Sequence, residues 1–180
     1  MRIAIIPARG GSKRIPQKNI KQFCGKPMIA WSIEAALNSN CFEQVIVSTD
    51  DEEIASIARF YGADVPFVRP KSLADDHTGT NPVIEHAIEW LSRQELNPDF
   101  VCLIYATAPF ICASDIQAGL NLIINNSCDY VLSVTSFAFP IQRGLKIDVE
   151  GKVEMFFPSN FQTRSQDLEE SFHDAGQFTW

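Results

Sequence analysis

Short apolar runs alternate with amphipathic stretches along most of this chain, and the alternation limits the folds open to it. Apolar runs of about four to eight residues suit buried strands, whereas longer stretches with a helical apolar period suit helices. The predicted strands cover residues 3–6, 43–48, 65–68, 100–104 and 130–134, and the predicted helices cover 27–38, 50–61, 80–92 and 114–125. This order predicts an α/β fold, in which crossover helices pack against a layered sheet.

Capping residues mark where three of the helices are expected to begin. Asp50 is expected to cap the second helix, with Glu53 returning the hydrogen bond in a capping box. Thr80 is expected to be the N-cap of the third helix. Ser114 and Gln117 are expected to form a second capping box at the fourth helix.

Polar loops follow the carboxyl ends of the predicted strands, which is the edge where open α/β sheets bind ligands. These loops contain residues 9–18, 48–50, Arg69, 105–109 and Thr135. Because the loops of all the predicted strands converge on one edge, we expect the binding site there.

The first of these loops is the most distinctive. Gly10 and Gly11 are adjacent, and a glycine pair lets the backbone curl so that successive N–H groups point at one spot. Cations crowd the same stretch, namely Arg9, Lys13, Arg14, Lys18 and Lys21. The loop therefore predicts a binding site for a polyphosphate, although it lacks the residue spacing of a Walker loop. A solvated basic turn after an edge strand is the alternative.

Charge and composition narrow the functional class. Residues 1–33 contain seven Lys and Arg and no Asp or Glu, although the whole chain has a formal net charge of −7. A net acidic chain argues against a nucleic-acid partner but permits a local anion site. The five cysteines show no paired spacing, which favours the reducing cytoplasm, without disulfides or structural zinc. Neither a signal peptide nor a membrane span is expected.

The pattern changes from Phe137 onward. Segments 145–148 and 152–155 flank an expected turn at 149–151, which predicts a hairpin. The apolar residues of this hairpin lie outside the predicted main sheet and need a cover. A second copy of the chain is the simplest cover, so we expect a homodimer.

Several motifs together resemble the cytidylyltransferases of the CMP-sialic acid synthetase family, which activate nine-carbon acidic sugars. The motifs are Ala-Arg-Gly-Gly-Ser-Lys at 8–13, Val-Ser-Thr-Asp at 47–50, Arg-Pro at 69–70, Tyr-Ala-Thr-Ala-Pro at 105–109, Pro-Ile-Gln-Arg at 140–143, Thr-Arg-Ser-Gln-Asp-Leu at 163–168 and His-Asp-Ala-Gly-Gln at 173–177. The last four motifs are similar to the branch of the family that acts on pseudaminic acid.

The resemblance implies a fold and a reaction. The fold is a three-layer Rossmann-like sheet of the nucleotide-diphospho-sugar transferase type, forming one nucleotidyltransferase domain over 1–180. Residues 138–172 form a dimerisation extension within it. The implied reaction joins CMP from CTP to a nine-carbon acidic keto sugar, and it releases pyrophosphate. The product is expected to serve the modification of flagellin or of a surface glycan.

The resemblance also implies roles for individual residues. The implied nucleotide-binding residues are Ala8, Arg9, Gly10, Gly11, Ser12, Lys13, Asn19, Arg69 and Thr80. Arg9 and Lys18 are implied to be catalytic residues, because they would stabilise the charge of the CTP phosphates during the reaction. The implied sugar-binding residues are Thr107, Gln142, Lys146, Arg164 and Gln166.

The implied cofactor is Mg²⁺, with ligands expected beyond Trp180, so that this chain would be truncated relative to the family. Two alternatives remain open at the level of the sequence. The chain is a synthetase for CMP-sialic or CMP-legionaminic acid, or it is a nucleotide-binding module that does not catalyse.

Overall fold

The computed structural model describes all 180 residues, which form two compact units. The first unit comprises Met1–Ser133 and Gly176–Trp180, and the second comprises Val134–Ala175. The chain therefore leaves the first unit once and returns to it once. The expected extension at 138–172 falls inside the second unit.

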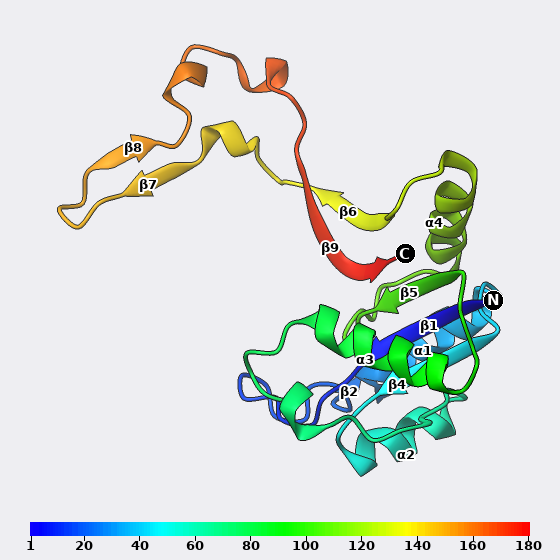
Figure 1. Cartoon of the computed structure of the whole chain (residues 1–180). Coiled ribbons are helices and arrows are strands. Elements are labelled where there is room, and N and C mark those ends of the chain that lie inside the picture. The colour runs from blue at the N-terminus through cyan, green and yellow to red at the C-terminus, as the bar shows by residue number, and fades with distance from the viewer. The chain divides into compact units, whose positions relative to one another are not determined.

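The main sheet has five strands in the order β4-β1-β5-β9-β6 (Figure 1). Their bounds are Gln44–Ser48 for β4, Arg2–Pro7 for β1, Phe100–Ile104 for β5, Phe172–Thr179 for β9 and Leu132–Ser136 for β6. Strand β1 runs parallel to both β4 and β5, whereas β9 is antiparallel to β5. Two short strands, β2 (Gln22–Phe23) and β3 (Lys26–Pro27), form a separate hairpin.

Helices cover both faces of the sheet in the first unit. They are α1 (Met28–Asn38), α2 (Glu52–Phe60), α3 (Thr80–Arg93) and α4 (Ala113–Asn126). Successive residues of a strand point to opposite faces, so β1 contributes to two apolar clusters. Ala4 and Ile6 pack with residues of α1, α2 and α4, whereas Ile3 and Ile5 pack with α3. Figure 1 shows α3 on the face opposite to α1, so the expected three-layer α/β fold is confirmed.

The predicted strand at 65–68 is wrong. Within this segment only Val68 pairs with the sheet, through an isolated bridge to Thr49, and a second isolated bridge joins Ile46 to Asp64 just before the segment. Pro66 has no backbone N–H to donate to a ladder, which accounts for the missing strand.

The predicted helix caps are also wrong, each by a small shift along the chain. The N-cap of α2 is Asp51, whose carboxylate accepts a hydrogen bond from the Ile54 N–H at 3.0 Å. This arrangement leaves the side chain of Asp50 available to the neighbouring loop. Thr80 is the first helical residue of α3, after Gly79 at the N-cap.

The capping box predicted at α4 is absent because the N-cap is Cys112, two residues before Ser114, and the helix begins at Ala113. Ser114 therefore lies inside the first turn. Gln117 donates instead to the Ser39 carbonyl at 2.7 Å, which ties α4 to the end of α1.

Strand β9 was not predicted, and β6 begins two residues later than expected. Three of the eight residues of β9 are exposed, four are half-buried, and Phe178 is the one that is buried. Such a strand lacks the alternation that identifies a half-buried strand. Its pairing beside β5 decides its structure, since the Tyr105 N–H donates to the Gln177 carbonyl at 2.9 Å.

The second unit contains the predicted hairpin, formed by β7 (Leu145–Ile147) and β8 (Val153–Met155). Leu145 lies opposite Met155, and Ile147 lies opposite Val153, so these four apolar side chains share one face.

Four 3₁₀ turns complete the structure, at Lys71–Leu73 in the first unit and at Ile141–Arg143, Pro158–Asn160 and Ser165–Asp167 in the second. No helix combines the length and the apolar character needed to cross a bilayer.

Gly119 in α4 provides a test of the packing. A Cβ at this position would lie 2.8 Å from the Trp180 ring and 2.9 Å from the Phe178 ring. Both rings are buried, so they have little room to move. We expect Gly119→Ala to lower the free energy of unfolding by about 1–3 kcal/mol in urea titration, despite the better helix propensity of alanine. Asn121→Ala, on the exposed side of the same helix, is the control and should not destabilise the protein; an equally stable Gly119→Ala protein would contradict this packing.

Candidate active site

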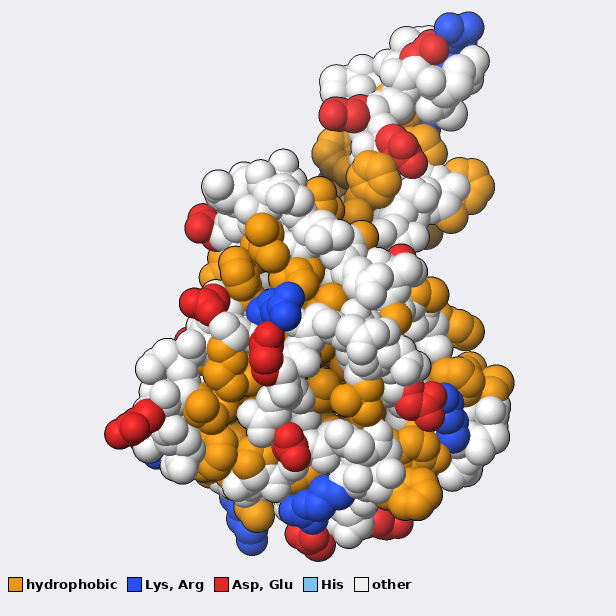
Figure 2. Space-filling model, turned by 90° about the vertical axis from the view of Figure 1, so that its right-hand side faces the viewer, with side chains coloured by type: hydrophobic (Ala, Val, Ile, Leu, Met, Phe, Trp, Pro, Cys, Tyr) orange, Lys and Arg blue, Asp and Glu red, His pale blue; other side chains and the backbone are white.

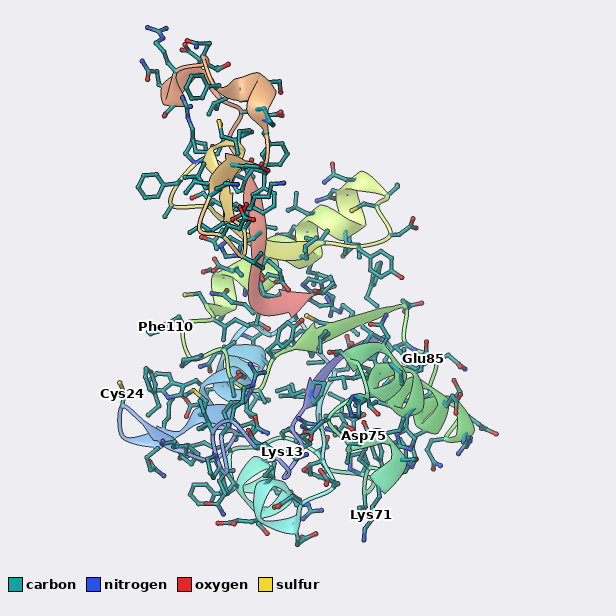
Figure 3. The ribbon with its side chains drawn as sticks, turned by 90° about the vertical axis from the view of Figure 1, so that its left-hand side faces the viewer. Lys13, Cys24, Lys71, Asp75, Glu85 and Phe110 are labelled. Carbon is teal, nitrogen blue, oxygen red and sulfur yellow. The ribbon has the colours of Figure 1, made fainter.

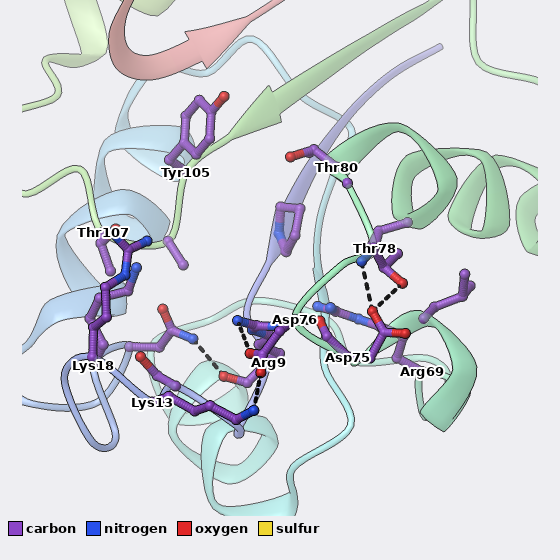
Figure 4. A pocket seen from close by; sticks show the side chains of 18 of the residues that line it. Arg9, Lys13, Lys18, Arg69, Asp75, Asp76, Thr78, Thr80, Tyr105 and Thr107 are labelled. Atoms are coloured by element: carbon purple, nitrogen blue, oxygen red, sulfur yellow. Dashed lines mark hydrogen bonds and ion pairs between the residues drawn. The ribbon is translucent and has the colours of Figure 1, made fainter.

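A cavity of about 700 Å³ opens at the carboxyl ends of β1 and β5 in the first unit (Figure 4). Its walls come from the loop after β1, from the segment between Arg69 and Val83, and from the residues that follow β5. The predicted edge of the sheet therefore does carry a cavity. Thr135, the fifth position expected there, belongs to the second unit.

Hydrogen bonds fix the loop after β1 at its base. The Ala8 N–H donates to the Ser48 carbonyl at 2.9 Å, which continues the pairing of β1 with β4 for one more residue. The Arg9 carbonyl accepts from the side-chain amide of Asn19 at 2.8 Å. Asn19 is buried, so this bond is shielded from water. The predicted residues Ala8 and Asn19 thus shape the loop that carries Arg9.

Gly10 is held against the start of α2. Its N–H donates to the carboxylate of Asp50 at 3.1 Å, and its carbonyl accepts from the Ser12 N–H at 2.9 Å. The prediction that both glycines offer free N–H groups to an anion is therefore wrong at Gly10. A Cβ on Gly10 would lie 2.6 Å from the Asp51 carboxylate, so glycine is required here by close packing.

Five cations line the cavity, and they differ in how they are paired. Arg9 and Lys13 both form ion pairs with Asp76, and the Arg9 Nη2 to Asp76 Oδ1 distance is 2.8 Å. Lys18 and Arg14 line the same cavity without an ion pair. Figure 3 shows Lys13 in the region where the loop after β1 meets the loop before α3. Arg14 belongs to the predicted basic loop, and no role in the site was predicted for it.

Arg69 is the most buried of these cations, with a relative exposure of 4%. It donates to the carbonyl of Ser48 and, at 3.2 Å, to the hydroxyl of the same residue. Burial lowers the pKa of Arg69, the charge of Asp50 opposes that shift, and the charge of Arg9 adds to it. A buried guanidinium that is bonded only to neutral groups attracts an anion or a carbonyl oxygen.

The segment before α3 contributes two carboxylates to the wall. Asp75 accepts hydrogen bonds from the N–H groups of His77 and Thr78, at 2.9 and 2.7 Å, and from the Thr78 hydroxyl at 2.7 Å. These bonds, chiefly the one from that hydroxyl, lower the pKa of Asp75. The hydrogen bond from Lys13 is the main cause of the lowered pKa of Asp76. The spacing of Asp75 and Thr78, typical of an Asx turn, could have identified this turn from the sequence.

The remaining predicted site residues divide between the two units. Thr80 and Thr107 line the cavity together with Tyr105, which belongs to the predicted polar loop 105–109, and with Val83, for which no place in the site was predicted. The other predicted sugar-binding residues, Gln142, Lys146, Arg164 and Gln166, all belong to the second unit.

Within the second unit, two of those four residues are engaged in ion pairs. Lys146 pairs with Glu154 at 2.8 Å, and Arg164 pairs with Asp167 at 2.7 Å. The amide nitrogen of Gln142 donates to the Glu169 carbonyl at 3.3 Å, while its buried oxygen has no hydrogen-bond partner. Their contact with a sugar remains a prediction.

The carboxylates of the cavity do not form a metal site. Nowhere in the chain do three or more His, Cys, Asp or Glu side chains come together in a way that could hold a metal ion. Asp75 is engaged with its own turn and Asp76 with two cations. The residues present therefore do not form a cage for Mg²⁺.

Residues 3–174, nearly the whole chain, match the model of the cytidylyltransferase family. The chain belongs to the cytidylyltransferase family. It is 47% identical over 176 residues to the pseudaminic acid cytidylyltransferase of Campylobacter jejuni, a match that covers 98% of this chain and 76% of that protein. It is also 48% identical over 111 residues to the CMP-N,N'-diacetyllegionaminic acid synthase of Legionella pneumophila, covering 60% of this chain and 47% of that protein.

A solved structure shares the fold of this cytidylyltransferase. The structure of CMP:2-keto-3-deoxy-manno-octonic acid synthetase complexed with CTP superimposes with a TM-score of 0.69 at 19% identity. The likeness covers 99% of this chain and 73% of that one. The expected nucleotide-diphospho-sugar transferase type of fold is thereby confirmed.

The two adjacent glycines give a matched test of the loop in this cytidylyltransferase. Gly10→Ala forces the loop away from α2 to relieve a 2.6 Å contact, at a cost of about 1–3 kcal/mol. We expect CTP affinity, measured by calorimetry, to fall about tenfold or more. Gly11→Ala is the control, because its added Cβ would meet nothing within 4 Å. Equal affinities for the two variants would show that the packing of Gly10 does not set the shape of the site.

Proposed function

We propose that this cytidylyltransferase joins CMP from CTP to pseudaminic acid, a nine-carbon acidic keto sugar, and releases pyrophosphate. The observation that carries the proposal is the 47% identity with a pseudaminic acid cytidylyltransferase over 98% of the chain. The legionaminic acid synthase reaches a similar identity over only 60% of the chain. The more extensive match favours pseudaminic acid over legionaminic or sialic acid.

The proposed reaction is a displacement at the α-phosphorus of CTP. The anomeric hydroxyl oxygen of the sugar attacks that phosphorus, the bond to the bridging oxygen of the β-phosphate breaks, and pyrophosphate carries the charge away. The hydroxyl proton is lost to water. Catalysis of this step depends on positioning the two reactants and on stabilising the negative charge of the phosphates. It does not need a covalent intermediate with the enzyme.

The cations of the cavity suit this demand. Arg9, Lys13 and Lys18 are proposed to hold the phosphates, and Arg14 stands beside them in the same wall. Fixed positive groups aimed at developing charge lower the barrier because they need no reorganisation during the reaction. Thr80, in the cavity wall, and the backbone at Ala8, whose side chain is buried, are proposed to lie beside the cytosine, with buried Arg69 near the nucleotide.

Mg²⁺ is proposed as the counter-ion that arrives with CTP. Mg²⁺ is usually bound through one or two carboxylates together with substrate phosphates and water, so it does not require a preformed cage. The carboxylates described above are engaged elsewhere, and no step of the reaction is assigned to the ion. We also propose that the enzyme works in the cytoplasm and that its product serves the glycosylation of flagellin or of a surface glycan.

Mass spectrometry of the products tests the substrate. The chain is incubated with CTP, Mg²⁺ and a panel of pseudaminic, legionaminic and sialic acids. We expect the CMP adduct of pseudaminic acid to form fastest, because the match to the pseudaminic acid enzyme extends over nearly the whole chain. A faster reaction with another acid of the panel would overturn the choice of sugar, and CTP binding without any product would favour the non-catalytic alternative.

Arg9→Ala provides the matching loss-of-function variant. The Arg9 guanidinium is bonded to the polar loop at Asp75 and Asp76. A charge-assisted hydrogen bond is worth about 1.5–3 kcal/mol, so turnover should fall about 10- to 150-fold. Arg59→Ala, which removes an exposed arginine paired with Glu52 on α2, is the control and should keep full activity. Both proteins should unfold at nearly the same temperature as the parent. Full turnover by a folded Arg9→Ala protein would remove the loop after β1 from the active site.

A homodimer built on the second unit is the second part of the proposal. Leu145, Ile147 and Val153 lie on the shared apolar face of the hairpin, and each is more than half exposed. Figure 2 shows apolar side chains, in orange, at the molecular surface. A two-stranded ribbon is marginally stable alone, and an exposed apolar face gains stability when it is covered.

Light scattering tests the dimer. We expect the mass in solution to be twice that of one chain at micromolar concentration, and Ile147→Asp to shift it toward the monomer by placing a charge on the apolar face. Val149→Asp is the matched control, because Val149 is fully exposed in the turn beyond that face. A monomeric parent protein would refute the interface.

A further inference from the structure

The phosphate-binding cations of the cavity are already paired with an anion of the protein itself. One oxygen of Asp76 lies 2.8 Å from Arg9 Nη2, and the other oxygen pairs with Lys13 Nζ (Figure 4). Two oxygens on one centre that bridge an arginine and a lysine reproduce what a phosphate group would offer the same cations. Asp76 thus stands where a ligand phosphate would neutralise the loop.

The loop that carries Asp76 is arranged to hold it there. Arg9 donates through its other terminal nitrogen to the carbonyl of Asp75, so one guanidinium binds two successive residues. The carboxylate of Asp75 organises the turn through Thr78, as described above. The turn therefore has its own internal support and does not depend on the carboxylate of Asp76.

The pairing is also one that a ligand can break. Arg9 and Asp76 are each about one third exposed, and Lys13 is 84% exposed. Exposed ion pairs contribute little net stability, because water and salt compete with them. A triphosphate carries several negative charges, whereas a carboxylate carries one. CTP should therefore displace Asp76 from both Arg9 and Lys13.

We propose that Asp76 is a built-in competitor for the phosphates of CTP, which leaves Arg9 and Lys13 when the nucleotide binds and returns to them as pyrophosphate departs. The inference rests on the proposed function, since it takes the cavity to be the CTP site. Lys18 and Arg14 have no such competitor, so they are free to meet the incoming phosphates first. Asp76 acts through the two cations and is a positioning residue with respect to the reaction.

Calorimetric titration of the whole chain with inorganic pyrophosphate, and separately with CTP, tests the exchange. Asp76→Asn and Asp76→Ala remove the competing charge, so both variants should bind pyrophosphate about 3- to 10-fold more tightly than the parent. Glu89→Gln removes an equally charged group from an exposed pair with Arg93 on α3, and it should leave both affinities unchanged. Tighter binding is informative because a damaged or misfolded loop would weaken binding instead.

The outcomes separate the inference from the proposed function. Unchanged or weaker pyrophosphate binding in both Asp76 variants would overturn the exchange, whatever the enzyme makes. A parent chain that binds pyrophosphate but not CTP would count against the nucleotide assignment, while the variants still report on the exchange. In turnover assays the exchange predicts a lower KM for CTP and stronger inhibition by added pyrophosphate in both variants. A raised KM together with weaker inhibition would contradict it.

Discussion

The parallel pairing of β1 with both β4 and β5 is the constraint on which the rest of this structure depends. Parallel strands end at the same edge of a sheet, so the loops that follow them must face one another. Pro7 is in register with Ser48, and the bond from Ala8 to Ser48 extends that register into the loop. The glycine loop, the start of α2 and the residues after β5 therefore meet because the ladder aligns them.

Much of this arrangement could be predicted from the sequence, because strong local signals and global packing agree. The run from Ile3 to Ile6 is wholly apolar, and it forms a strand with helices on both faces. The glycine pair and its cations marked the loop that lines the cavity. Four of the five polar loops expected at the edge belong to the unit that contains the cavity.

The cap of α2, strand β9 and the ion pairs of Asp76 could not be predicted, because they depend on contacts between residues distant in the sequence. No local sequence pattern encodes such contacts. Asp50 and Asp51 are equally good caps by composition, and only the position of Gly10 shows that one caps the helix while the other holds the loop. Strand β9 has no regular alternation of apolar and polar residues, and it becomes a strand through its neighbour β5. The pairing of Asp76 with two cations joins segments more than sixty residues apart, and charge patterns along the chain do not reveal it.

The two-unit organisation has a consequence for how such an enzyme can diversify. The second unit leaves and re-enters the first through β6 and β9, which are adjacent strands of one sheet and are joined where Ser133 exchanges hydrogen bonds with Phe178. The two ends of the inserted segment are therefore about one strand spacing, some 5 Å, apart. An insertion with neighbouring ends can be lengthened, replaced or recombined without breaking the sheet that carries the cavity. The second unit and the sheet that carries the cavity can thus change independently of each other within one gene.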